Sequence, residues 1–385
     1  MPRETQLTHG PDGRILTNCN VWSSDGQWIV YDTRSDPAGD RFDGTHIEMV
    51  NAVTGEVRVL YESRNGAHCG VATWHPNEPK IVFILGPEFP TPDWSYSPSH
   101  RQGVIVETLN PGVAVPMDAR DLVPPFTPGA LSGGTHLHVW HPLGDWISFT
   151  YEDALVNAAR NLGFGIPDRP VTVPKTHPRN HDGSHFSVLV TKTDETLLRA
   201  SEEAWVGRSR KLAFQGEIAP GMREVFIAEV PDDPTNSETT MRRLTDTTSH
   251  KYPGIAGPRH WLHSSPDGSR IGFLKLDDAG IAQFWTVSPK GGKPRQITHG
   301  LHPVASAFTW HPDGTRVAFV MNNAICLCDL ETGSVKELTN PHDDSIRPEA
   351  CVVSPNGNHI AFVRRRGDVN QICVVELNGD CGIPD

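Results

Sequence analysis

The sequence predicts an all-β fold, a single seven-bladed β-propeller. Three observations favour this fold: a composition rich in turn formers, one motif repeated along the chain, and an N-terminal segment that completes the last repeat. The 385 residues include 35 glycines and 33 prolines, and no convincing helical period of apolar residues runs through them. Short strands joined by turns are therefore expected from end to end.

The repeated motif consists of a strand, a turn of the S/H-P-D-G type, and a second strand with alternating apolar residues. Its copies are W-S-S-D-G-Q-W-I-V-Y-D from Trp22, W-H-P-N-E-P-K-I-V-F-I from Trp74, W-H-P-L-G-D-W-I-S-F-T from Trp140, S-S-P-D-G-S-R-I-G-F-L from Ser264, W-H-P-D-G-T-R-V-A-F-V from Trp310 and V-S-P-N-G-N-H-I-A-F-V from Val353. A gap of 124 residues between the third and fourth turns is about twice the other gaps, and a degenerate copy, W-V-G-R-S-R-K-L-A-F-Q from Trp205, fills it. Seven repeats of roughly 45 residues with four strands each predict seven blades.

The ends of the chain are expected to close the ring. The last repeat stops one strand short at Q-I-C-V-V-E-L-N-G-D, and E-T-Q-L-T-H-G near the N-terminus resembles the end of the fifth repeat, P-R-Q-I-T-H-G. An N-terminal strand in the last blade removes an open sheet edge, so residues 1–385 are predicted to form one domain. Two excursions interrupt the repeats, at about 86–101 and 152–184, and each is either a pocket wall or a surface loop.

Composition excludes several classes of partner. The net charge is −12, with 34 basic and 46 acidic residues, which argues against nucleic acid and anionic membrane surfaces. No segment approaches the ~20 apolar residues of a spanning helix, and the first residues have no apolar signal region. We therefore expect a cytoplasmic protein, and its seven cysteines are expected to be reduced and structural.

Alignment of the repeats assigns several conspicuous residues to structure. Two places before the turn aspartate position, histidine alternates with serine, so His75, His141 and His311 are expected to hold the turn. Tryptophan recurs one place earlier and is expected to pack blade against blade. Neither set is interpreted as a binding site.

A polar ring is predicted seven places before the turn position, where the innermost strands begin. Its members are Asn18, Gly70, His136, Ser201, His260, Ser306 and Glu349. His138 and Glu203 lie two places further along their strands, His68 lies two places before the ring, and Arg259 and Arg347 lie beside it. His136 and His138 form a H-x-H pair, which a regular strand would place on one face.

Two interpretations of this ring remain open. The first is a water-filled channel lined by hydrogen-bonding side chains. The second is a divalent metal (Mn, Zn, Fe or Ni) held by three or four of His68, His136, His138 and His260. Buried ionisable groups in such number are expected to be paired, metal-bound or wet.

The repeats resemble those of the TolB-like propellers. The runs L-T-N-C-N-V-W-S-S-D-G-Q-W-I-V-Y-D, G-A-H-C-G-V-A-T-W-H-P, T-P-G-A-L-S-G-G-T-H-L-H-V-W, G-S-H-F-S-V-L-V and Y-P-G-I-A-G-P-R-H-W more closely resemble a bacterial family within them, the YidR-type proteins. This resemblance implies the propeller fold over nearly the whole chain, and it implies no particular chemistry.

A more distant resemblance is to oligogalacturonate lyases, whose H-x-H pair before a proline-containing turn is similar to His136 and His138 before Trp140 and Pro142. That family implies a divalent metal and β-elimination of uronates by His and Arg. The resulting hypothesis is a metal-assisted lyase or hydrolase acting on a polar, carbohydrate-derived substrate at the axial mouth. Arg259 would clamp the substrate and His185 would be the base, with Arg347, Glu349 and Glu203 as further substrate-binding residues.

The alternative is a non-catalytic propeller that binds a protein or another ligand over one face. In that case the histidines line the channel and the excursions are contact loops. A serine peptidase is disfavoured because the chain contains no G-x-S-x-G motif.

Overall fold

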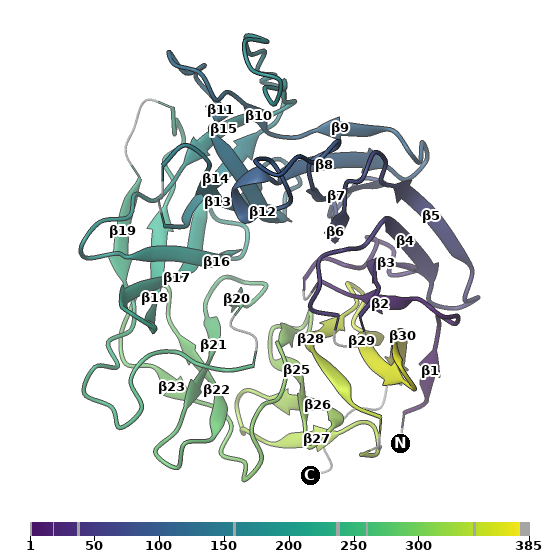
Figure 1. Cartoon of the computed structure of the whole chain (residues 1–385). Helices are drawn as coiled ribbons and strands as arrows, with labels where there is room; N and C mark the ends of the chain where they lie inside the picture. Colours follow the sequence, from purple (N-terminus) through teal and green to yellow (C-terminus); the bar gives the residue numbers. More distant parts are fainter. Residues whose placement is uncertain are drawn as a thin grey trace.

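A computed structural model shows a ring of sheets arranged around a central axis (Figure 1). The structure describes residues 2–17, 19–36, 39–156, 159–235, 239–258, 261–341 and 344–377. Within these ranges the chain forms seven four-stranded sheets, and every pairing inside them is antiparallel. The predicted all-β, seven-bladed propeller is confirmed.

The first four blades follow one another along the chain. Blade 1 contains β2 (Gly13–Ile15), β3 (Trp28–Arg34), β4 (His46–Asn51) and β5 (Val57–Glu62). Blade 2 contains β6 (Cys69–Trp74), β7 (Lys80–Leu85), β8 (Gln102–Glu107) and β9 (Ala114–Pro116). Blade 3 contains β12 (Gly133–Trp140), β13 (Ile147–Asp153), β14 (Asn161–Ile166) and β15 (Phe186–Leu189). Blade 4 contains β16 (Arg199–Trp205), β17 (Lys211–Ala219), β18 (Met222–Glu229) and β19 (Thr240–Arg243).

The last three blades complete the ring. Blade 5 contains β20 (His263–Ser264), β21 (Ile271–Leu276), β22 (Ala282–Val287) and β23 (Arg295–Gln296). Blade 6 contains β24 (Thr309–Trp310), β25 (Arg316–Met321), β26 (Ala324–Asp329) and β27 (Val335–Glu337). Blade 7 contains β28 (Ile346–Val353), β29 (His359–Arg366), β30 (Val369–Glu376) and, as its outer strand, β1 (Glu4–Gln6). A short parallel pair, β10 (Ala119–Arg120) and β11 (Ala130–Leu131), and the 3₁₀ turn η1 (Pro98–His100) lie outside the blades.

The predicted closure by the N-terminal strand is present. β1 pairs with β30, so the first and last described segments lie in one sheet (Figure 1). The carboxylate of Glu4 accepts hydrogen bonds from Arg364 at 2.8 Å and from Arg366 at 2.7 Å. Strand pairing and charge therefore hold the ring shut at the same place.

The turn histidines and the repeated tryptophans have the structural roles that alignment predicted. Nε2 of His75 lies 2.8 Å from the carbonyl oxygen of Gly144, and Nε2 of His311 lies 3.1 Å from that of Gly357, so each histidine reaches the turn of the next blade. The indoles of Trp22, Trp205 and Trp310 donate to carbonyl oxygens of a neighbouring blade. These residues join blades.

The second excursion is shorter than predicted. Residues 161–166, which we assigned to it, form β14 and supply the third strand of blade 3. The remainder folds back toward β10, where backbone hydrogen bonds join Arg120 and His181. The glycines in N-L-G-F-G-I conceal the strand in the sequence, and a Cβ at Gly163 would lie 2.5 Å from the ring of Phe149. Small residues are needed there because blade 3 packs closely.

A bulge recurs near the start of the innermost strands. Val71, Leu137 and Glu202 occupy equivalent positions and all have left-handed φ, at 61°, 54° and 56°. The strand register shifts at each of these places. Two residues of the inner strand then oppose one residue of its partner, which re-aims the side chains around the axis.

Two further features concern the described chain as a whole. The six cysteines within the described ranges are free. Across those ranges, no helix is long and apolar enough to span a membrane.

Candidate functional site

A pocket of about 430 Å³ lies at the mouth where the inner strands begin, and we call it the axial pocket. Blades 1, 2, 3, 5 and 7 all contribute to it. It is lined by Ile15, Leu16, Thr17, Asp32, Arg34, Gly39, Asp40, Phe42, Val71, Tyr96, Arg101, His136, Trp261 and Glu349. The predicted meeting of His136 and Glu349 at one mouth is therefore observed.

His136 is the histidine of the H-x-H pair that lines the axial pocket. It pairs with Thr150 just before the bulge at Leu137. Burial lowers the pKa of His136 well below its usual value, and the positive charges of Arg101 and Arg160 lower it further. The imidazole is consequently neutral at neutral pH and can accept a hydrogen bond or a proton.

His138 points into the protein instead. Its side chain is fully buried, and its Nε2 lies 2.9 Å from Oγ1 of Thr135, which donates to Oδ1 of Asp118 at 3.2 Å. Burial lowers the pKa of His138 to about 3. The bulge at Leu137 thus separates two side chains that a regular strand would present together.

Glu349 is held by a neighbour on its own strand. Arg347 donates to both carboxylate oxygens of Glu349, from Nη2 at 2.9 Å and from Nε at 3.1 Å. Nη2 of Arg347 also lies 3.4 Å from Oδ1 of Asp40. The two predicted substrate-binding residues of blade 7 therefore form one bidentate ion pair at the rim.

The first blade contributes an ion pair that sequence reasoning missed. Nε of Arg34 donates to Oδ2 of Asp32 at 2.6 Å, and Oδ1 of Asp32 accepts a hydrogen bond from the backbone of Val71 at 2.9 Å. Burial raises the pKa of Asp32, and the charge of Arg34 opposes that shift. Gly70 makes the approach feasible, because a Cβ there would lie 2.8 Å from Oδ2 of Asp32.

An aromatic stack extends from this pair to the blade-two excursion. The guanidinium of Arg34 lies 4.8 Å from the ring centroid of Phe42, which stacks on Tyr96 at 4.5 Å, and Arg101 lies 5.3 Å from the Tyr96 centroid. Tyr96 and Arg101 belong to the 86–101 excursion. Excursions of this kind were the sequence signal for a pocket wall, although no pattern in the sequence indicated which residues would face the axis.

Arg101 differs from Arg34 and Arg347, which each form an ion pair with a carboxylate. Within the described residues its Nε and Nη1 atoms are buried without a hydrogen-bond partner, and it takes part in no ion pair there. Burial lowers its pKa, yet an arginine remains protonated at neutral pH. A buried cation with unused donors in a pocket is a binding element for an anion.

Three more of the predicted site residues, all within the described ranges, do not line the axial pocket. Glu203 is buried between blades 3 and 4, where it accepts a hydrogen bond from Thr150 at 3.0 Å. His185 is buried against Trp140, with ring centroids 6.5 Å apart, and Oγ of Ser184 lies 3.0 Å from its Nδ1. His68 is half-buried just before β6. Arg259 and His260 lie outside the described residues.

The donor set of the described residues does not fit a divalent metal. Of the predicted ligands within the described ranges, only His136 lines the axial pocket, and the charges that act on it are those of arginines. No group of three or more His, Cys, Asp or Glu side chains in those ranges is close enough to hold an ion. Cations near His136 disfavour a second cation there.

Comparison with known proteins shows the family to which the chain belongs. The chain is 43% identical over 396 aligned positions to the "Uncharacterized protein YidR" of Escherichia coli (strain K12), covering 93% of this chain and 94% of that protein. The chain belongs to the YidR family. A family model described as "Protein of unknown function (DUF3748)" matches residues 68–181, which include the first excursion, most of the second, and most of blades 2 and 3.

Solved structures support the fold of this family. An oligogalacturonate lyase in complex with manganese superposes with a TM-score of 0.65 and 13% identity, covering 98% of this chain and 94% of that one. An oligogalacturonate lyase from Vibrio parahaemolyticus matches with a TM-score of 0.61 and 11% identity, over 99% and 95% of the two chains. At these identities the likeness concerns the fold alone.

Proposed function

We propose that the axial pocket binds an acidic carbohydrate and acts on it as a lyase by β-elimination. The observation that carries the proposal is Arg101, a buried cation with unused donors, in a pocket that also holds the neutral imidazole of His136. A uronate offers a carboxylate for Arg101 and an acidic C–H bond next to it. The likeness to an oligogalacturonate lyase supports this choice of substrate class.

In the proposed reaction, Arg101 binds the carboxylate and stabilises the charge that builds on it as the adjacent proton leaves. His136 accepts that proton, the C–O bond at the next carbon breaks, and a carbon–carbon double bond forms. No water is consumed. The departing sugar oxygen takes up a proton from solvent, and His136 returns to solvent the proton that it accepted. Bound carboxylate also offsets the arginine charges that lower the pKa of His136, so substrate binding strengthens the base.

Arg347 and Glu349 are assigned to orientation of the substrate at the rim, because their mutual ion pair fixes both side chains. The proposed reaction uses no metal ion, because the donor set of the described residues does not fit one. The charge-stabilising role that the sequence hypothesis gave to a metal and Arg259 falls to Arg101, and the role it gave to His185 falls to His136.

The test is a lyase assay with a panel of uronate oligomers, in which an unsaturated product is detected by its ultraviolet absorbance. Arg101→Gln is expected to lower kcat/KM about 10²-fold or more, and His136→Gln is expected to lower kcat by about 10²–10⁴-fold. Arg365→Gln, on β29 and outside the lining of the axial pocket, is the matched control and should leave both values unchanged. Thermal unfolding establishes that each variant is folded.

The outcomes separate the two functional hypotheses. If the oligomers bind with a dependence on Arg101 and no unsaturated product forms, the axial pocket is a binding site without lyase chemistry. If they do not bind at all, the proposal for the axial pocket is overturned.

A further inference from the structure

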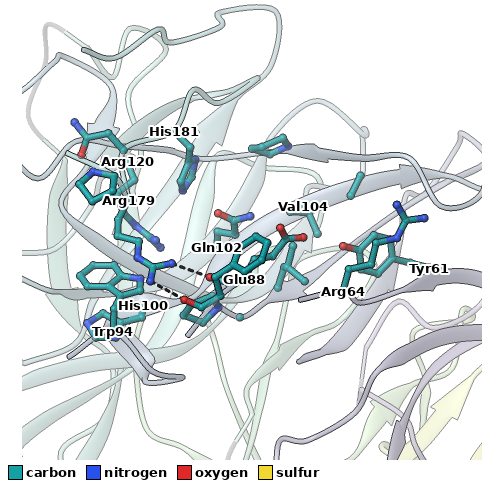
Figure 2. A pocket seen from close by; sticks show the side chains of 18 of the residues that line it. Tyr61, Arg64, Glu88, Trp94, His100, Gln102, Val104, Arg120, Arg179 and His181 are labelled. Carbon is teal, nitrogen blue, oxygen red and sulfur yellow. Dashed lines mark hydrogen bonds between the residues drawn. The ribbon is translucent and has the colours of Figure 1, made fainter. Parts of the chain in front are cut away.

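A second pocket, of about 510 Å³, lies away from the axis between the two excursions, and we call it the side pocket (Figure 2). The blade-two excursion supplies Glu88, Trp94 and His100, and the blade-three excursion supplies Arg179 and His181. Strand β8 of blade 2 forms its back. Its volume falls within the roughly 300–1,000 Å³ of small-molecule sites.

The walls of the side pocket are fixed before any ligand arrives. Arg179 donates from Nη1 to the carbonyl oxygen of Glu88 at 2.7 Å and from Nη2 to that of Phe89 at 2.9 Å (Figure 2). Reciprocal backbone hydrogen bonds of 2.9 and 3.2 Å join Arg120 to His181. Two segments far apart in sequence are thus locked together, which lowers the entropic cost of binding.

The side pocket carries excess positive charge. Arg64, Arg120 and Arg179 line it, and within the described residues none of the three forms an ion pair with a carboxylate. Among the described residues, Glu88 is the one acidic side chain that lines it, and its carboxylate accepts a hydrogen bond from Asn65 at 3.2 Å. The local surplus contrasts with the net charge of −12 of the whole chain.

Arg120 is the buried cation of this site. Its guanidinium donates to two carbonyl oxygens, that of Gly133 at 3.2 Å and that of Arg101. Burial lowers its pKa to about 10, and attraction to Asp118 partly opposes the shift, so Arg120 stays charged at neutral pH. Bonds to neutral carbonyls leave its charge largely uncompensated.

His181 adds an acceptor beside Arg120. Its Nδ1 lies 3.3 Å from the carbonyl oxygen of Asp182, while Nε2 is buried without a hydrogen-bond partner within the described residues. Burial lowers the pKa of His181 to about 3, so the ring is neutral. Because the carbonyl assigns the proton to Nδ1, Nε2 presents a lone pair that a ligand hydroxyl can satisfy.

We propose that the side pocket binds a small polyhydroxylated anion, either a sugar acid or a sugar phosphate. The anionic group would lie at the end formed by Arg120 and Arg179, a hydroxyl would donate to His181, and Arg64 and Tyr61 would flank the other end (Figure 2). The proposal stands independently of the axial pocket and of any catalysis there.

Calorimetric titration with D-glucuronate, D-glucose 6-phosphate and D-glucose tests this site. At least one of the two anions should bind, and glucose should bind at least about tenfold more weakly. Binding of glucuronate alone identifies a carboxylate ligand, and binding of the phosphate alone identifies a phosphate ligand. Binding of neither up to about 10 mM, or equal binding of glucose, overturns the proposal.

Variants distinguish the side pocket from the axial pocket. Arg64→Met and His181→Ala should each weaken binding of the anion by about three- to tenfold, since each removes one hydrogen-bonding or charged partner. Arg101→Gln, in the axial pocket, should leave that binding event unchanged. The proposal fails if Arg64→Met and His181→Ala have no effect, or if Arg101→Gln removes the binding instead.

Discussion

Glu203 shows how strongly the interior of this ring can shift the pKa of a single residue. Its side chain is 3% exposed, one carboxylate oxygen accepts from Thr150, and the other has no hydrogen-bond partner within the described residues. Burial raises its pKa to about 8. The sequence predicted a polar axial residue here, and the structure places it where only the neutral acid is favourable.

A pH-dependent stability follows from Glu203. The folded state binds the carboxyl proton more tightly than the unfolded state, so the stabilisation is complete below the unfolded pKa near 4.5. It is lost as pH rises toward about 8. Glu203→Gln should remove this loss, and its advantage over the wild-type chain should grow to a few kcal/mol, roughly, across that window.

Urea unfolding at a series of pH values measures the effect of Glu203. Glu376→Gln alters an exposed glutamate at the end of β30 and serves as the control, with no expected change in the pH dependence. If wild type and Glu203→Gln lose stability in parallel from pH 5 to pH 8, Glu203 is not the buried acid described above.

The innermost strand is the element in which the side-chain positions expected from the sequence differ from those in the structure. The alignment of repeats located the axial ring correctly, because His136 and Glu349 line one pocket. It could not locate the bulge, since Leu137 is an ordinary apolar residue, unlike the glycine or asparagine that usually marks a left-handed backbone in a sequence. His138 and Glu203, each the first residue after a bulge, were therefore assigned to the wrong neighbours.

The residues that line the axial pocket with His136 could not be predicted from the sequence, for a different reason. Arg34 and Asp32 come from β3, and Tyr96 and Arg101 come from an excursion with no repeat to align. Their convergence depends on how the blade-two excursion packs against blade 1, where Tyr96 stacks on Phe42. Local spacing carries no information about such contacts.

The bulge can be tested through Gly103 on β8. A Cβ at Gly103 would lie 2.6 Å from Nε2 of His138, so Gly103→Ala should destabilise the protein by about 1–3 kcal/mol. His138→Ala opens space at that point, so the double variant should be more stable than the two single effects predict, by about 0.5–3 kcal/mol.

Urea unfolding of the four proteins in this cycle gives the coupling energy. Gly103→Ala paired with His311→Ala, at the turn of blade 6, should be additive within about 0.5 kcal/mol. Additivity of Gly103→Ala with His138→Ala would show instead that the His138 side chain lies elsewhere, as a regular H-x-H strand would require.

At the scale of the molecule, the ring closes where β1 pairs with β30 in blade 7, and we call this place the seam. Six blades are continuous in the chain, whereas blade 7 combines β28, β29 and β30 with β1 from the opposite end of the sequence. Repeat counting predicted this arrangement because composition and spacing are global properties that a few misplaced residues do not disturb. The seam carries the only blade whose integrity depends on both ends of the described chain.

Glu4 is the charged part of that seam, and its replacement is the test of closure. Glu4→Gln leaves the side chain of Arg364, which is 0% exposed, without its carboxylate partner, and it also removes the pair with Arg366. Loss of one partner from a buried pair costs about 3–5 kcal/mol, and the partial exposure of Glu4 places the expected loss near the lower end. Glu56→Gln breaks the exposed pair with Arg58 and should cost less than about 1 kcal/mol. Equilibrium unfolding in urea compares the two variants, and hydrogen exchange should show faster exchange of the β30 amides in Glu4→Gln alone. If both variants lose equal stability and β30 remains protected, the N-terminal strand does not hold the ring closed through Glu4.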